Sequence, residues 1–72
     1  MKAKPDLHDV VELREERGGQ PAGAVGAVVE LFPSEALVEF TDEGGRTVEL
    51  LSVPYGALSV RSAQPAVRRA AG

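Results

Sequence analysis

The chain has 72 residues, a net charge of −3 and no cysteine. This length allows one domain with a small core, and the lack of cysteine excludes disulfides, thiolate metal sites and cysteine nucleophiles. The acidic balance and the small number of aromatic residues (Phe32, Phe40 and Tyr55) argue against general nucleic-acid binding, which needs basic stripes or stacking platforms.

The sequence also gives no sign of a membrane segment or a metal site. No apolar run approaches the roughly 20 residues that cross a bilayer. Residues 1–6 lack the apolar stretch of a signal peptide, and one histidine, His8, is too little for a zinc site. We therefore expect a cytoplasmic protein that contacts no membrane and carries no metal or cofactor.

The first half of the chain predicts two strands and a long loop. Residues 9–13 form a short segment with two β-branched valines and charged residues on both sides, which is typical of a strand. Residues 14–23 are rich in charge, glycine and proline and predict an exposed loop. Residues 24–31 predict a second strand, which ends at a turn over residues 33–35 because proline presets its φ there.

The second half predicts two hairpins and a final strand. Residues 36–41 and 46–53 predict a third and a fourth strand joined by a glycine-rich turn at 42–45, with Val38 and Phe40 in phase around Glu39. Residues 54–57 fit one turn of 3₁₀ helix, and residues 58–60 close as a short fifth strand.

This order predicts a mainly β fold, a small five-stranded SH3-like barrel with a short 3₁₀ turn before the last strand. We expect the barrel to occupy residues 7–62. Residues 1–6 and 63–72 are predicted to be a flexible N-terminus and a flexible C-terminal tail, because they offer little to bury.

Strand phase predicts a register for each hairpin. If Val38 and Phe40 point inward, Phe40 opposes Val48 and Val38 opposes Leu50, since directly opposed residues share a face. The turn then becomes a three-residue loop with Gly45 in the left-handed conformation. In the preceding hairpin, the same rule pairs two more apolar residues with these positions: Val29 with Phe40, and Leu31 with Val38.

The opposite face then carries a row of glutamates across three strands: Glu30, Glu39 and Glu49. Like charges opposed across strands are destabilising. The row is therefore either an acidic patch for a basic partner or a cation, or a solvated face that keeps the sheet from pairing with others.

Five apolar residues fall in the outward phase of the predicted strands: Val10, Val28, Leu37, Leu51 and Val53. A lone barrel leaves such residues uncovered. Either a homodimer or partner protein covers them, or strand bulges change the phase.

A histidine and two glycines offer weaker indications of function. His8 is a pH-sensitive contact or a packing residue at a strand entry, and Gly23 and Gly26 are turn and close-packing glycines, since no phosphate-loop lysine follows.

Three segments resemble a known family. Residues 8–13, 22–30 and 38–42 are similar to the patterns D-V-V-x-L, G-x-x-G-T-V-V-E and V-E-F-x-D-x-x-G-x-T of the short bacterial family called domain of unknown function 4926. The resemblance spans residues 7–60, with Ala27 in place of the usual threonine. It implies a barrel fold in a small cytoplasmic protein. Some members of the family it resembles are encoded beside toxin-like or other uncharacterised genes, and the resemblance therefore implies an antitoxin-like or other binding role.

We therefore expect a non-enzymatic module that contacts another protein or a second copy of itself. Its predicted contact surface is an apolar strip, Leu37, Leu51 and Tyr55, bordered by the glutamate row. One alternative is a small oligomeric enzyme built from symmetric barrels, like plasmid-type dihydrofolate reductases, whose pore strand residues 48–53 faintly resemble. The other is a nucleic-acid-binding SH3-like barrel. No catalytic residue is predicted.

Overall fold

The computed structural model describes residues 4–62, which form five strands and one 3₁₀ turn. The elements in chain order are β1 (Val10–Leu13), β2 (Val25–Leu31), β3 (Glu35–Thr41), β4 (Thr47–Pro54), the 3₁₀ turn η1 (Tyr55–Ala57) and β5 (Leu58–Ser62). The predicted flexible tail, 63–72, and residues 1–3 lie outside the described residues.

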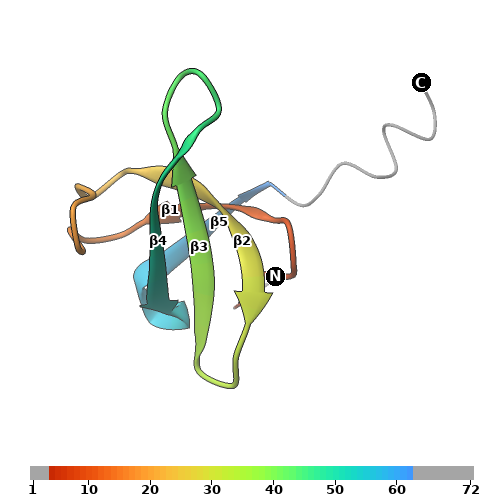
Figure 1. Cartoon of the computed structure of the whole chain (residues 1–72). Coiled ribbons are helices and arrows are strands. Elements are labelled where there is room, and N and C mark those ends of the chain that lie inside the picture. The colour runs from red at the N-terminus through yellow and green to blue at the C-terminus, as the bar shows by residue number, and fades with distance from the viewer. Residues whose placement is uncertain (1–3, 63–72) are drawn as a thin grey trace.

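The described strands form one antiparallel sheet in the order β4-β3-β2-β1-β5, so β4 and β5 are its two edges. In Figure 1, β4, β3 and β2 run side by side, and β1 and β5 cross them. The mainly β fold with five strands and a 3₁₀ turn before the last one is confirmed. The predicted closure is not seen, because the sheet remains open between β4 and β5.

The core lies on one side of this bent sheet. We call it the inner face, and it is the face of Val38 and Phe40; the other side is the outer face. Both residues are buried, and they belong to a cluster with seven other buried apolar residues: Val11, Leu13, Val28, Ala36, Val53, Ala57 and Leu58. Burial of this cluster is the main favourable contribution to folding.

The register of the β3–β4 hairpin differs from the prediction by one residue. Thr41 opposes Thr47 as expected, but a bulge follows, and Phe40 then opposes Glu49 instead of Val48. At the tip, the prediction is confirmed, since Gly45 has a φ of 84° and its N–H donates to the carbonyl of Asp42 at 3.0 Å.

One extra residue reverses the faces of β4 because side chains alternate along a strand. Val48 and Leu50, predicted to point inward, are 55% and 53% exposed. Val53, predicted to point outward, is fully buried, and Leu51 packs against the core.

A second bulge makes the β2–β3 register differ from the predicted one. Val28 opposes Val38, and Glu30 opposes Leu37, so Val29 is skipped. The predicted Val29–Phe40 and Leu31–Val38 pairs are therefore wrong. Val28 is fully buried although its predicted phase was outward.

Bulges thus account for part of the predicted outward apolar set. Val28, Leu51 and Val53 turn to the inner face, whereas Leu37 and Val10 stay on the outer face.

The predicted roles of Gly23 in a turn and of Gly26 in close packing are confirmed. Gly23 has a φ of 91°, and Gly26 packs so closely that an added Cβ would lie 2.7 Å from the carbonyl oxygen of Glu39.

Candidate functional site

The three glutamates of the predicted row do not lie together. Glu39 is on the outer face opposite Leu50, and Glu30 is on the same face opposite Leu37. Glu49 opposes Phe40 and therefore lies on the inner face. The predicted row is wrong because the β4 bulge moves Glu49 to the other side of the sheet.

Glu49 instead holds the long loop between β1 and β2. The backbone N–H of Gly19 donates to Oε2 of Glu49 at 3.1 Å, and Nε2 of Gln20 donates to Oε1 at 2.9 Å. The bonds from Gln20 and Gly19 hold the pKa of Glu49 below its ordinary value, and desolvation acts in the opposite direction. This carboxylate is occupied within the chain and is a structural residue.

The tip of that loop is itself a tight hairpin. Arg17 and Gln20 exchange two backbone hydrogen bonds of 2.9 Å around Gly18 and Gly19. Gly18 has a φ of 59°, which suits the first central position of a type II′ turn. A Cβ at Gly18 would lie 2.8 Å from Cδ2 of Leu51. The tip therefore covers the inner-face side chains of β4. The two consecutive glycines, Gly18 and Gly19, are the sequence signal for this tight turn.

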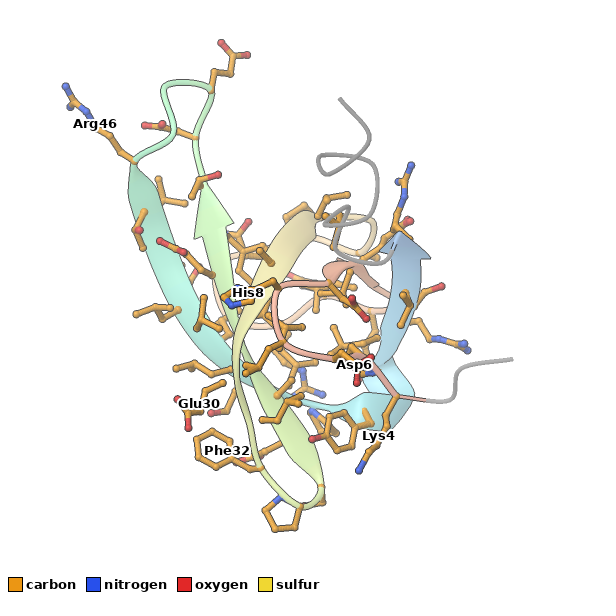
Figure 2. The ribbon with its side chains drawn as sticks, turned by 90° about the vertical axis from the view of Figure 1, so that its right-hand side faces the viewer. Lys4, Asp6, His8, Glu30, Phe32 and Arg46 are labelled. Atoms are coloured by element: carbon orange, nitrogen blue, oxygen red, sulfur yellow. The ribbon has the colours of Figure 1, made fainter. Side chains whose placement is uncertain are left out.

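The predicted apolar strip is also divided. Leu37 lies on the outer face and Leu51 on the inner face, so the sheet separates them. Tyr55 begins η1 and packs against the core, and its hydroxyl donates to the carbonyl oxygen of Phe32. Figure 2 shows Phe32 beside Glu30 near the turn that joins β2 to β3.

The structure brings a different set of residues to the surface at the end of the sheet. β4 pairs with β3 alone among the described strands, and its exposed side chains include Val48, Leu50 and Ser52. We call these three residues the β4 edge. Leu50 continues a row on the outer face that crosses three further strands: Glu39, Ala27 and Val10. The β4 edge is the candidate functional site.

The region around the β4 edge is acidic. Between residues 35 and 54 there are five carboxylates, Glu35, Glu39, Asp42, Glu43 and Glu49, and one guanidinium, that of Arg46. Arg46 projects from the hairpin tip, far from Glu30 and Phe32 (Figure 2). Across the described part, all eleven carboxylates of the chain are present, with five of its eight lysines and arginines, so the formal charge there is −6.

The segment before β1 is held in place by backbone bonds. His8 is exposed and has a φ of 71°, and its N–H donates to the carbonyl of Val28 at 2.8 Å. Asp9 is buried, and its carboxylate accepts the N–H of Asp6 at 2.8 Å. The entry to β1 is thus ordered by Asp9, the first residue of the D-V-V-x-L pattern, for which the sequence predicted no structural role.

Other candidate chemistry is limited in the described part of the chain. An open groove is lined by residues of β1, the loop after it and β5: Glu12, Leu13, Arg14, Ala22, Gly23 and Ser59. Its charged groups already have partners, since Glu12 pairs with Arg61 at 3.2 Å and Nε of Arg14 donates to the carbonyl of Leu58 at 3.3 Å. Within residues 4–62, no group of three or more acidic or histidine side chains is arranged to hold a metal ion.

Residues 4–62 contain no helix with the length and hydrophobicity to span a bilayer.

No curated protein and no solved structure matches the chain. A family model does match residues 7–60, and its description is "Domain of unknown function (DUF4926)". This match spans three quarters of the chain and the five strands as far as Val60, including the whole β4 edge. The chain therefore belongs to the domain of unknown function 4926 family.

Proposed function

We propose that this protein is a non-enzymatic binding module whose partner docks on the β4 edge. The observation that carries the proposal is the exposure of two large apolar side chains, Val48 and Leu50, on an edge strand. Exposed apolar side chains on an unpaired edge are a template for association, and natural proteins usually blunt such edges with lysine or proline. β4 has a bulge at Val48 and a proline at its last residue, Pro54, but residues 49–53 between them contain neither lysine nor proline.

The order of strands, the long first loop and the 3₁₀ turn before β5 favour an SH3-like scaffold for this module. The family resemblance favours a cytoplasmic bacterial setting and an antitoxin-like or regulatory partner encoded nearby, and we include both in the proposal.

The experiment compares two leucines of similar exposure. Leu50 is 53% exposed on the β4 edge, and Leu7 is 46% exposed before β1. Tagged full-length protein, L50S and L7S are expressed in the native host, cross-linked and purified at several salt concentrations. We expect one partner to be recovered with the wild-type chain and with L7S, and to be lost with L50S.

Two results would refute the proposal. One is recovery of the protein alone at every salt concentration tested. The other is recovery of the same partner with L50S at wild-type yield. Thermal melts of both variants show whether a loss reflects unfolding, since substitution of an exposed leucine usually changes stability by no more than about 0.5 kcal/mol.

A further inference from the structure

We propose that the β4 edge binds an extended cationic segment of its partner as an added strand, with an apolar residue beside Leu50 and a lysine or arginine beside Ser52. The inference rests on the proposed function, because it names the chemistry of the partner at the same surface.

The backbone of β4 is the first support. The strand has eight residues, whereas β5, the other edge, has five. An edge strand presents unpaired N–H and C=O groups, and an extended peptide can pair with them along the strand. The bulge at Val48 and the proline at position 54 limit the regular part to residues 49–53. An added strand would therefore pair along this stretch.

The side chains of residues 49–53 determine which face of β4 the side chains of an added strand can contact. On the inner side, the loop tip binds the carboxylate of Glu49 and lies against Leu51. On the outer side, Leu50 and Ser52 are exposed. Because side chains on one face of a strand are two residues apart, the partner's specificity lies in two positions, one beside each of these residues.

The position beside Ser52 favours a cation. Ser52 opposes Leu37 of β3, and Leu37 is flanked on the same face by Glu35 and Glu39. Glu39 accepts a hydrogen bond from the hydroxyl of Thr47, and neither glutamate forms an ion pair with a described residue, so both charges remain without a countercharge. Adjacent strands lie about 4.8 Å apart. A lysine or arginine beside Ser52 is therefore long enough to cross this small side chain and bring its charge near the two carboxylates.

The charge of the chain selects this occupant over a second copy. The whole chain has a net charge of −3, and residues 35–54, which include β3 and β4, carry five carboxylates and one guanidinium. Pairing of two β4 edges would bring the same carboxylates of β3 close to one another, and like charges oppose association. A cationic partner gains from the same field, which also accelerates its encounter with the edge.

The test is a titration of the ¹⁵N-labelled full-length chain with a synthetic peptide, acetyl-TVTKTVTKT-amide. One face of this peptide, when extended, alternates valine and lysine. We expect saturable shifts at the amides of residues 49–53, with a Kd on the order of 0.1–1 mM, as for a weak encounter. Binding should weaken severalfold between low and high salt, because exposed charges are screened.

Two control peptides separate strand addition from simple charge attraction. The first has glutamate in place of lysine, and the second is N-methylated at alternate residues, which removes donors while leaving the charge. We expect both to bind at least tenfold more weakly. On the protein, S52K should weaken binding by a similar factor, whereas E16Q, in the loop after β1, should leave it unchanged.

Several results would overturn the inference. They are shifts confined to β5, equal binding of the N-methylated peptide, no saturable shift, or sedimentation of the free chain as a dimer that L50S dissolves. If the cellular partner still depends on Leu50 while the peptide fails, the inference about cationic strands is wrong and the proposed function stands.

Discussion

The backbone N–H of Gly19 and the carboxylate of Glu49 are joined at 3.1 Å, across thirty positions of sequence. This bond, with the one from Gln20, fixes the tip of the β1–β2 loop against the inner side of β4. It leaves exposed the outer side of the same strand, which is the surface proposed for the partner. The loop is therefore part of what defines the candidate site.

Replacement of Glu49 by glutamine should loosen this loop. An amide has one acceptor oxygen and would present its NH₂ group to either Gly19 or Gln20, both of which donate to Glu49. We expect faster hydrogen exchange at the amide of Gly19, measured by NMR. Glu43→Gln, at the exposed hairpin tip, is the matched control and should leave that exchange unchanged.

The same bonds predict a pH dependence. The pKa of Glu49 is lowered in the folded chain, mainly by Gln20 and then by Gly19. The stability that it contributes is therefore fully present above its unfolded pKa, ordinarily 4.5, and is lost as the pH falls through the lower folded value. An NMR titration should give Glu49 a midpoint below its ordinary value of 4.5, and a midpoint at or above that value would contradict the assignment.

Gly26 should not tolerate alanine. An added Cβ would meet the carbonyl oxygen of Glu39 and Cγ1 of Val38, both at 2.7 Å. Overpacking of this kind costs about 1–3 kcal/mol, and urea denaturation should show the loss as a lower midpoint. At Gly56 an added Cβ meets no atom within 4 Å, so G56A should change stability by no more than about 1 kcal/mol.

The corrected register of β4 can be tested by two truncations. Val53→Ala removes two methyl groups from a fully buried side chain and should cost about 2 kcal/mol. Leu50→Ala truncates a side chain that is 53% exposed and should change stability by about 0.5 kcal/mol or less. The register expected from simple alternation gives the reverse order, so the two denaturation curves decide between them.

The sequence was sufficient for the number of strands, for the 3₁₀ turn and for the glycine at the hairpin tip. Each of these depends on local chemistry: alternation of apolar residues, proline and glycine punctuation, and a positive φ at Gly45. These signals depend on a few neighbouring residues and therefore do not depend on contacts with distant parts of the chain.

The register and the site could not be predicted in the same way. β4 contains apolar residues in both phases, Val48 and Leu50 in one, Leu51 and Val53 in the other, so alternation alone did not say which pair is buried. A bulge adds one residue without a composition signal of its own. The Glu49 contacts depend on a loop thirty residues away, which no local pattern reports.

The place of β1 in the sheet has a consequence for how the chain is made. β1 lies between β2 and β5, and Leu13 opposes Leu58, the first residue of β5. The ribosome must therefore release nearly the whole domain before β1 gains its second neighbour, and closing that long segment is an entropic cost of folding. Until then, the apolar side chains of the nascent sheet remain accessible to other molecules, so rapid completion of β5 protects the protein during synthesis.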